Sequence, residues 1–435
     1  MNSPVWKSVP LSSCIDKVID FRGKTPKKIG MEWGNGSIRA LSANNVKQGY
    51  IDFKRECYLA SEELYDAWMT KGDCSKGDIV FTMEAPLGNV ALIPDDNKYI
   101  LSQRVILLKP NESVLSEYLF HFMSSKSFQN ELNANATGST AKGIKQTRLV
   151  KLKVTLPPTE EQQKIAEVLS TVDKKIDLID QKIAETEKLK TGLMQKLFSE
   201  GVGVQGENGE WQPHTEFQYE SLLGKKPKSW QTETLGNVLD IASSKRIKRE
   251  EYVNEGVPFY RSKEIILKSK QLSFTSEIFI SRERFDKLSE KFGSPQQGDI
   301  LISAVGTIGA IYRVRDEEFY FKDGNLLWIR NIDKSRLSSE FLECYFRSYL
   351  CQEMLANLSA GSSQNALTIV KLSKLPLIIP TKDEQKMIVS IISSINEKIY
   401  LLKAQKSETQ QLKKGLMQKL LTGEWRVPLK ENEAA

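Results

Sequence analysis

A six-residue sequence, Gly-Leu-Met-Gln-Lys-Leu, occurs twice in this chain and constrains the fold more than any other feature. The copies are residues 192–197 and 415–420, so their offset is 415 − 192 = 223 residues. At this offset the two halves correspond without a gap back to residues 137–139 and 360–362. A repeat at a fixed offset constrains the architecture before any local pattern does. Two long copies are too few for a solenoid, so the sequence predicts a molecule with internal pseudo-twofold symmetry.

Each copy contains a stretch with the spacing of a coiled-coil seam. Between Glu161 and Phe198 the chain has no proline and only one glycine. Aliphatic residues recur there at alternating steps of four and three, the period with which two helices pack together. At 1.5 Å per residue, each helix would be about 55 Å long. We predict that the two helices form an antiparallel coiled coil; the alternative is that each helix packs only on its own domain. The predicted seam consists of Ile165, Leu169, Val172, Ile176, Ile179 and Ile183 in the first copy, and Ile388, Ile392, Ile395, Ile399 and Leu402 in the second.

The rest of the sequence predicts two mixed α/β domains of similar plan. In residues 1–157, short apolar strands alternate with polar loops and turns. The second domain repeats this order, with Trp230 in the place of Trp6 and Gly298-Asp299 in the place of Gly77-Asp78. The predicted class is therefore α+β. The predicted order is a domain at 1–157, a helix at 158–200, a glycine-rich linker at 201–227, a domain at 228–378, a helix at 379–424 and a polar tail at 425–435.

Composition narrows the possible functions. The 435 residues carry a net charge of +7, which permits a nucleic-acid partner without requiring one. Five cysteines form no CxxC pair, and an odd number argues against a disulfide framework. No signal peptide or membrane-spanning run is visible, so we expect a cytoplasmic protein. Only two histidines, His121 and His214, are available for catalysis or metal binding.

Motifs for catalysis are weak. Gly23-Lys24-Thr25 resembles the end of a phosphate-binding loop, but Val18 stands where that motif requires its first glycine. The acidic run at 94–98 resembles a nuclease cluster but is better explained as a solvated turn between strands. We therefore expect a chain that binds its target and has neither a catalytic site nor a metal site of its own.

The repeated elements together resemble the specificity (S) subunit of Type I restriction-modification systems. The resemblance rests on two α/β domains, each followed by a helix that begins with similar residues, at 156–165 and 379–388. It also rests on the Gly-Lys-Thr-Pro loop at 23–26, the Gly-Asp-Ile turns at 77 and 298, and the Gly-Ser pairs at 138 and 361. It covers residues 4–425. The second domain departs from it, because residues 243–249 (Ser-Ser-Lys-Arg-Ile-Lys-Arg) replace Gly-Lys-Thr-Pro.

The resemblance implies a function as well as a fold. Each α/β unit would be a target-recognition domain that reads one half of a split double-stranded DNA sequence, and the two helices would set the gap between the halves. The subunit would dock two methyltransferase subunits and, through them, motor–nuclease subunits. It would itself be non-catalytic, with S-adenosylmethionine, ATP and Mg²⁺ bound by the partner subunits.

Candidate DNA contacts follow from the chemistry of recognition. Lysine, arginine and hydroxyl groups contact phosphates, whereas arginine reads guanine and asparagine or glutamine reads adenine. Asn44 and Asn45 form the most interesting pair, although a turn-forming asparagine is an equally good explanation there. The first-domain candidates are Lys24, Lys27, Arg39, Asn44, Asn45, Arg104, Ser139, Lys142 and Lys145. The second-domain candidates are Lys245, Arg246, Lys248, Arg249, Arg261, Lys263, Asn325, Ser362 and Gln364.

Two other functions compete with DNA recognition. A non-DNA-binding assembly scaffold, held by its coiled coil, would show no salt-dependent affinity for DNA. An enzyme with a cryptic nuclease site would cleave DNA in the presence of a metal. The target sequence and its gap length do not follow from composition.

Overall fold

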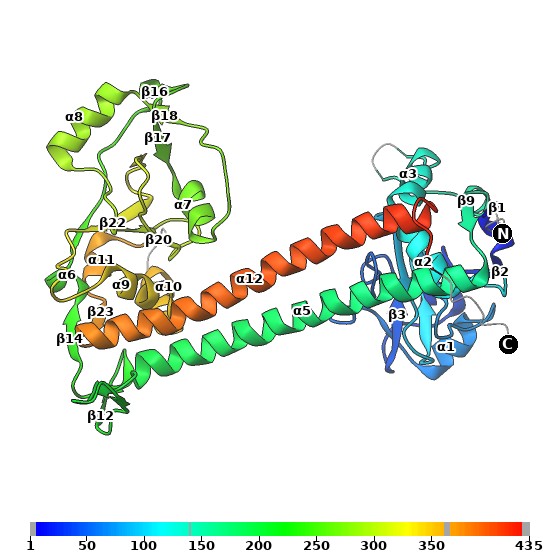
Figure 1. Ribbon diagram of the computed structural model, residues 1–435, viewed down its shortest axis with the longest axis horizontal. Helices are drawn as coiled ribbons and strands as arrows, with labels where there is room; N and C mark the ends of the chain where they lie inside the picture. The colour runs from blue at the N-terminus through cyan, green and yellow to red at the C-terminus, as the bar shows by residue number, and fades with distance from the viewer. Residues whose placement is uncertain (1–5, 139–140, 361–365, 429–435) are drawn as a thin grey trace. The chain divides into compact units, whose positions relative to one another are not determined.

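The computed structural model describes residues 6–138, 141–360 and 366–428. Internal contacts divide the chain into two compact units, residues 1–181 with 403–435 and residues 182–402. Each unit contains one α/β domain together with one half of each long helix (Figure 1). None of the helices in the described part combines the length and the apolar composition that a membrane crossing requires.

The first unit is built on a four-stranded antiparallel sheet and a smaller three-stranded sheet. The four-stranded sheet has the order β2 (Ile15–Asp20), β8 (Val105–Pro110), β5 (Ile79–Met83), β6 (Leu87–Leu92). In the smaller sheet, β3 (Ile38–Leu41) lies between β4 (Leu59–Ala60) and β7 (Tyr99–Leu101), and β3 and β7 are parallel. β1 (Lys7–Pro10) pairs with β9 (Lys153–Leu156). The helices of this domain are α1 (Glu62–Trp68), α2 (Ser116–Ser124), α3 (Lys126–Ala134) and α4 (Gln146–Leu149), with 3-10 turns at Leu11–Ser13 and Pro26–Ile29.

The second unit repeats this topology. Its four-stranded sheet has the order β15 (Asp240–Ala242), β22 (Leu326–Arg330), β19 (Ile300–Ser303), β20 (Ile311–Arg313). In a second sheet, β17 (Val257–Tyr260) is parallel to β21 (Tyr320–Phe321), and β18 (Phe279–Ile280) joins β17 to β16 (Tyr252–Val253). β14 (Gln231–Thr234) pairs with β23 (Pro376–Ile379). The helices are α6 (Leu235–Val238), α7 (Ser262–Ser269), α8 (Arg282–Phe292), α9 (Ser339–Arg347), α10 (Tyr349–Ala360) and α11 (Ile369–Ser373), with a 3-10 turn at Arg249–Glu251.

The segment before the second domain forms two hairpins. The expected linker at 201–227 contains β10 (Val204–Gln205) paired with β11 (Trp211–Gln212), and β12 (Phe217–Glu220) paired with β13 (Gly224–Pro227). Glycine at 203 lets the two sides of the first hairpin approach closely, because a Cβ on Gly203 would lie 2.0 Å from the carbonyl oxygen of Gln212. Strand pairing, which the composition of this segment did not indicate, orders the connection.

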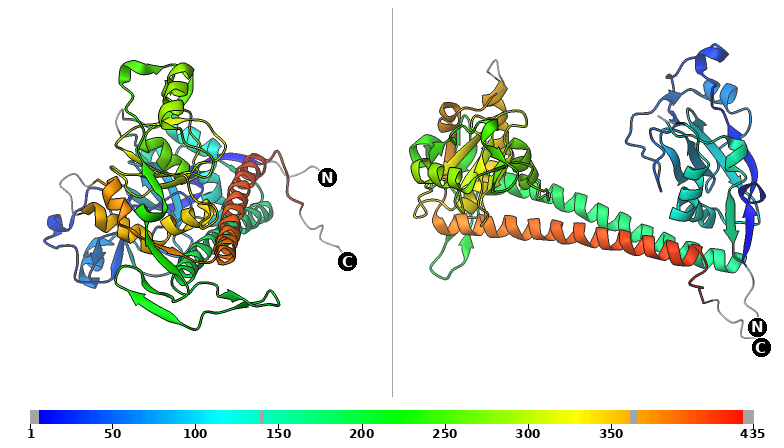
Figure 2. Two further views of the ribbon diagram at one scale, coloured as in Figure 1. Left: turned by 90° about the vertical axis from the view of Figure 1, so that its left-hand side faces the viewer. Right: turned by 90° about the horizontal axis from the view of Figure 1, so that it is seen from above.

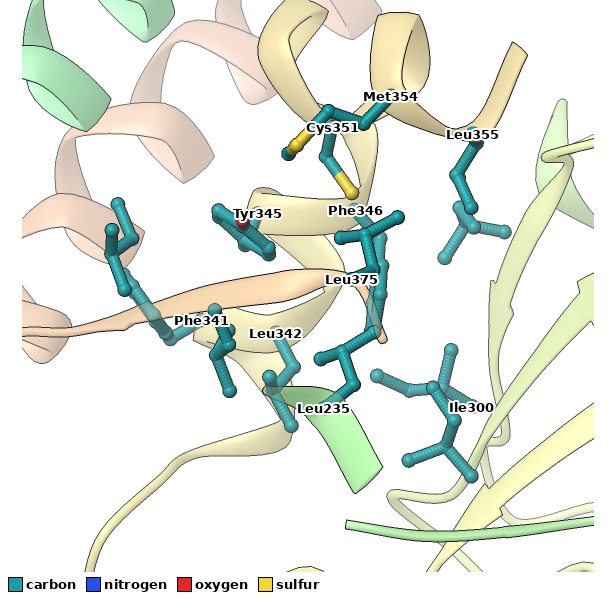
Figure 3. Packing of buried hydrophobic residues seen from close by; sticks show 14 of the residues in the cluster. Leu235, Ile300, Phe341, Leu342, Tyr345, Phe346, Cys351, Met354, Leu355 and Leu375 are labelled. Atoms are coloured by element: carbon teal, nitrogen blue, oxygen red, sulfur yellow. The ribbon is translucent and has the colours of Figure 1, made fainter. Parts of the chain in front are cut away.

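The central strand of each domain is buried along its whole length. Every residue of β5 and of β19 is buried, as expected for a strand with apolar side chains packed on both faces. In the second domain, α9 and α10 cover one face of the sheet. Phe341, Tyr345 and Phe346 of α9 pack with Leu235, Leu375 and Ile300 in the same cluster (Figure 3).

Two long helices follow the domains, α5 (Thr159–Ser199) and α12 (Lys382–Leu421). Within each unit the halves of α5 and α12 that it contains lie side by side and run in opposite directions, so the two helices form an antiparallel coiled coil (Figures 1 and 2). In the first unit, Lys406 pairs with Asp180 at 2.6 Å and Lys413 with Asp173 at 2.5 Å, and both ion pairs join the helices.

The seam residues serve two kinds of packing. All eleven are buried or half-buried: Val172, Ile176, Ile395 and Leu402 are half-buried, and the other seven are buried. The first turns, with Ile165 and Leu169 in one helix and Ile388 and Ile392 in the other, also belong to the core of the domain that precedes each helix. The N-terminal part of each long helix therefore packs on the domain that precedes it, and the same helix also pairs with the other long helix.

The repeated motif packs on the domain of the opposite half. Met194, Leu197 and Phe198 at the end of α5 join the core of the second domain. At the end of α12, Leu420 and Leu421 join the core of the first domain. The last turns of each helix thus complete a domain that lies in the other half of the sequence, which explains why the apolar residues of the motif are needed twice.

Candidate nucleic-acid interface

Most of the candidate residues of the first domain belong to loops at one edge of the sheets. β2 and β5 end there, and their neighbours β8 and β6 begin there, because all these pairings are antiparallel. The parallel strands β3 and β7 also end at this edge. Loops 21–30, 42–50, 84–86 and 102–104 therefore lie together. We call this set the loop edge of the first domain.

Hydrogen bonds join these loops into one surface. The Ala43 backbone N–H donates to the Gln103 carbonyl at 3.3 Å, and the Met83 backbone N–H donates to the Arg104 carbonyl at 2.8 Å. Residues 141–145 join the same edge, where Ile144 N–H donates to the Met83 carbonyl at 3.1 Å.

The second domain has an equivalent loop edge. β15, β17, β19 and β21 end at this edge, and β20 and β22 begin there. Loops 243–248, 304–310 and 322–325 connect these strands. Ala304 N–H donates to the Asn325 carbonyl at 2.9 Å, and Ser244 Oγ donates to the Phe321 carbonyl at 2.6 Å, so these loops are also fastened together.

The same side-chain contacts hold the β5–β6 and β19–β20 hairpins in the two domains. Thr82 Oγ1 accepts a hydrogen bond from Asn89 N–H at 2.8 Å, and Ser303 Oγ accepts one from Ala310 N–H at 2.8 Å. Gln129 Nε2 then donates to the carbonyls of Gly88 and Met123, at 2.9 and 2.8 Å.

Gln352 does the same for the carbonyls of Gly309 and Phe346, at 3.0 and 2.6 Å. These fixed contacts hold each hairpin on the helices behind it, so that the loops on the other side can vary in sequence.

Several first-domain candidates are exposed at or beside the loop edge. Lys27, Asn44, Arg104, Lys142 and Lys145 are all exposed. Arg39 is exposed on β3, with its guanidinium 5.1 Å from the centroid of the Phe53 ring. Arg104 Nε lies 3.8 Å from Glu84 Oε1. Both side chains are half-exposed, so the guanidinium of Arg104 stays accessible.

Three first-domain candidates form hydrogen bonds within the protein, and one of them, Asn44, remains exposed while its Nδ2 donates to the Glu56 carbonyl at 3.2 Å. Asn45 is fully buried: its Oδ1 accepts from Ser42 N–H at 2.8 Å and its Nδ2 donates to the Ala40 carbonyl at 3.1 Å. This is the turn-forming role that the sequence left open. Lys24 donates to the carbonyls of Ala67 and Trp68 at the end of α1, at 2.9 and 3.0 Å. Burial lowers the pKa of Lys24, and Lys71 contributes to the same shift.

In the second domain, residues 243–249 carry a dense group of cations. Lys245, Arg246, Lys248 and Arg249 are exposed, whereas Ile247 between them is buried and fixes the segment to the domain. The Lys245 ammonium lies 4.6 Å from the centroid of the Phe292 ring. A buried anchor flanked by exposed cations suits contact with a phosphate backbone.

The remaining second-domain candidates are more constrained. Arg261 is held by Glu264 at 2.7 Å and by Glu277 at 2.9 Å, and these hydrogen bonds raise its pKa. Lys263 also contacts Glu277, at 2.8 Å. Asn325 is half-buried beside the start of β22. The candidates Ser139, Ser362 and Gln364 lie outside the described residues.

A stacked aromatic pair, of which Tyr58 is exposed and Trp33 is half-buried, was not anticipated from the sequence. The rings of Trp33 and Tyr58 stack with centroids 5.1 Å apart and planes inclined by 9°, and Tyr58 is 58% exposed. The spacing of Trp33 and Tyr58 in the sequence matches neither a helical nor a strand period. The two rings meet only because the chain around Tyr58 folds back beside β3. Gln129 and Gln352 were also missed, although they stand at the repeat offset of 223 and could have been found by it.

The duplicated domains, the shared loop edges and the paired helices define a protein that carries variable loops on a repeated scaffold. The sequence profile of the Type I restriction modification DNA specificity domain matches residues 6–188 and 227–411. The chain therefore belongs to this family, as a specificity subunit of a Type I restriction-modification system.

Individual relatives agree with this family. Two are from Methanocaldococcus jannaschii. The putative type I restriction enzyme MjaX specificity subunit is 28% identical over 395 residues, which cover 88% of this chain and 86% of the relative. The MjaIX specificity subunit is 28% identical over 417 residues, covering 93% and 90%. A solved structure from work on complex assembly and conformational transition of the type I R-M system matches with a TM-score of 0.60 and 21% identity, over 97% of this chain and 99% of that one.

Proposed function

We propose that this chain reads a bipartite double-stranded DNA target, with one half-site for each α/β domain, and is itself non-catalytic. In this proposal, two methyltransferase subunits that bind S-adenosylmethionine dock on it, and motor–nuclease subunits that use ATP and Mg²⁺ are recruited through them.

One observation carries the proposal. Equivalent loop edges of the two domains are held by matched contacts, which Thr82 and Gln129 make in the first domain and Ser303 and Gln352 make in the second, while the loops themselves differ in sequence. A scaffold that is kept the same while its loops change suits two readers of different sequences. The exposed lysines and arginines and the exposed asparagine at these edges are side chains of the kinds that contact phosphates and bases in proteins that bind DNA.

The paired helices support a fixed gap between the half-sites. At 1.5 Å per residue, the 41 residues of α5 and the 40 of α12 each extend about 60 Å. Successive major-groove faces on one side of B-DNA lie about 34–36 Å apart. Helices of this length can hold two readers at such a spacing, so a change in helix length would alter the gap, whereas a change in a loop would alter the bases that are read.

A binding selection on a random duplex library tests the function. The full chain, co-expressed with its methyltransferase subunit, should enrich two short fixed blocks separated by a constant unspecified gap. Replacing residues 228–378 by the equivalent domain of a relative should change one block and leave the other. Assembly with the methyltransferase without enrichment of any sequence would favour the scaffold alternative, and metal-dependent cleavage by this chain alone would favour the nuclease.

A further inference from the structure

A polar cavity in the second unit lies at the edge of the sheet opposite to the loop edge. Its volume is about 860 Å³, which is within the range of small-molecule sites. β19 begins beside this cavity, and β20 and β22 end beside it. A ligand bound there would be held away from the loops that the proposed function assigns to DNA. The lining residues that decide its chemistry are Asp299, Arg313, Trp328, Arg330, Lys334 and Lys382.

Asp299 places a buried carboxylate at this cavity, because it is only 8% exposed. Its Oδ2 accepts from the Gln296 N–H at 2.9 Å and from Trp328 Nε1 at 2.8 Å, so Oδ1 is left for a further donor. Among the described residues, none forms an ion pair with Asp299. Burial raises the pKa of Asp299 in spite of the two hydrogen bonds and the nearby charge of Arg330. A carboxylate in such a place is stabilised by a donor that reaches its remaining oxygen.

The first domain shows which donor is missing from the second. There the equivalent carboxylate, Asp78, pairs with Lys109 at 2.7 Å. Arg330 stands at the position of Lys109, but it pairs with Asp240 at 2.7 Å instead. Arg330 faces Asp240 across β15 and β22, whereas Lys109 faces Lys17 across β2 and β8. A reversal of charge at one strand position has therefore drawn the cation away from the carboxylate of the second domain.

The cavity also carries positive charge that the protein does not neutralise. Lys334 is exposed and takes the place of Glu112 in the equivalent turn of the first domain. Lys382 Nζ donates to the carbonyl of Lys334 at 2.8 Å, so a second ammonium group lies beside this turn. Neither lysine forms an ion pair within the described part of the chain, whereas Arg313 is held by Glu340 at 2.8 Å. Two ammonium groups of this kind suit a phosphate.

We propose that this cavity binds a guanine nucleotide. The N1–H and the 2-amino group of guanine are adjacent donors, and they would reach Asp299 Oδ1, as Lys109 reaches Asp78 in the first domain. The phosphates would lie at Lys334 and Lys382. Adenine would turn its N1 acceptor toward the carboxylate and be repelled, and a free amino acid would leave most of the cavity empty. The inference goes beyond the proposed function, because it adds a small-molecule site on the far side of the domain from the loop edge.

Competition for a fluorescent nucleotide tests the site on the full chain. The probe is GTP with a methylanthraniloyl group on its ribose, and fluorescence anisotropy reports its binding. GTP should displace the probe at least about tenfold better than ATP, because a site that binds a donor edge rejects a base without that edge. Guanosine, which lacks phosphates, should compete less well than GTP. Equal competition by GTP and ATP, or no binding of the probe, would overturn the proposal.

Asp299→Asn tests the assignment of the base. The Gln296 N–H and the Trp328 indole would hold the amide oxygen of the new side chain, so its NH2 group would face the cavity. A donor there repels the donor edge of guanine and pairs with N1 of adenine. The variant should therefore prefer ATP to GTP. Equal weakening of both nucleotides would give Asp299 a structural role only and would contradict the inference.

Three further variants test the rest of the site. Asp240→Lys restores the charge of the first domain and should return Arg330 to the buried carboxylate, so the probe should no longer bind while circular dichroism shows a folded chain. Lys334→Glu should weaken GTP about fivefold and leave guanosine unchanged. Lys270→Glu makes the same charge change at an exposed residue outside the cavity and should alter neither.

The outcomes separate this inference from the proposed function. Unchanged binding of the probe by Asp240→Lys, or equal effects of Lys334→Glu and Lys270→Glu, would count against the site. The selection of DNA targets does not use this cavity, so a failure of nucleotide binding leaves the result of that selection as it stands.

Discussion

The indole Nε1 of Trp230 donates a hydrogen bond to Glu384 Oε2 at 2.7 Å, although 154 residues separate them in the sequence. Trp6 donates the corresponding bond to Glu161 at 3.0 Å. Each tryptophan immediately precedes the first strand of its domain, and each glutamate stands in the first turn of the helix that follows the domain. The bond therefore ties the two ends of a domain together, and it places a carboxylate where the helix N-terminus favours negative charge.

Substitution of Glu384 should destabilise the second unit more than substitution of an exposed residue. Besides Trp230, its carboxylate accepts from the N–H groups of Val202 and Gly203, at 2.9 and 3.1 Å, and contacts His214 Nε2 at 2.9 Å. Glu384→Ala leaves these buried groups without a partner, so we expect the free energy of unfolding to fall by about 3 kcal/mol. Urea denaturation followed by tryptophan fluorescence measures the loss.

The neighbouring residue Asp383 provides the control for this prediction. It is exposed, stands in the same helical turn and pairs only at the surface, with Lys386 at 2.9 Å. Asp383→Ala should lower the free energy of unfolding by about 0.5 kcal/mol. Equal losses in the two variants would show that the bonds of Glu384 do not hold the connection to the domain.

Lys24 and Lys27 should separate stability from DNA binding within one loop. Lys24 donates to two carbonyls at the end of α1, whereas Lys27 is exposed. Lys24→Met should lower the free energy of unfolding by about 1–2 kcal/mol and leave DNA affinity unchanged once the variant is folded. Lys27→Met should weaken DNA binding without altering stability. Paired denaturation and fluorescence-anisotropy measurements decide between these roles, and a reversed pattern would place the phosphate contact on Lys24.

Much of the fold could be predicted because it depends on local patterns and on the repeat. The apolar run near residues 37–41 is β3, the Gly77-Asp78 turn leads into β5, and the seam spacing corresponds to helices α5 and α12. The repeat then required the second half to form the same framework again: a four-stranded sheet, a pair of parallel strands and a long helix. These features survive in a single sequence because alternation, capping and helical period are encoded by neighbouring residues.

The partners of individual side chains could not be predicted, because tertiary packing chooses them. Asn44 and Asn45 are adjacent and chemically identical, yet one is exposed and the other is fully buried in a turn. The tail offers a second example. Arg426 falls in a segment expected only to be polar, but its guanidinium Nε donates to Glu161 at 2.9 Å, and this bonding raises the pKa of Arg426. Neither outcome has a signature in residue type or spacing.

The cations at 245–249 should contribute separately to the salt dependence of DNA binding. Arg246→Ala and Lys248→Ala each remove an exposed charge from the loop edge of the second domain. If each contacts one phosphate, the slope of log K against log salt should fall by about 1 per substitution. Titrations of the assembled complex at several salt concentrations measure this slope.

Lys334→Ala is the matched charge control for these substitutions. Lys334 is exposed in the same domain but follows β22 at the opposite edge of the sheet. Its removal should leave the slope unchanged. An equal effect from Lys334 would mean that general charge, and not the loop edge, attracts DNA.

His121 should make the first unit sensitive to acid. It is 1% exposed, and burial, reinforced by Lys413, lowers its pKa to about 3. In the unfolded chain the pKa of histidine is about 6.5, so between these values the unfolded state binds the extra proton. Stability should therefore be unaffected above pH 6.5 and fall as the pH drops below it, by up to about 1.4 kcal/mol per pH unit. His121→Gln, which can keep the contact of Nε2 with Ser170 at 3.2 Å, should remove this part of the slope. Urea denaturation of both proteins at pH 7.5, 6.0 and 5.0 measures the difference; parallel curves would assign the acid sensitivity to other groups.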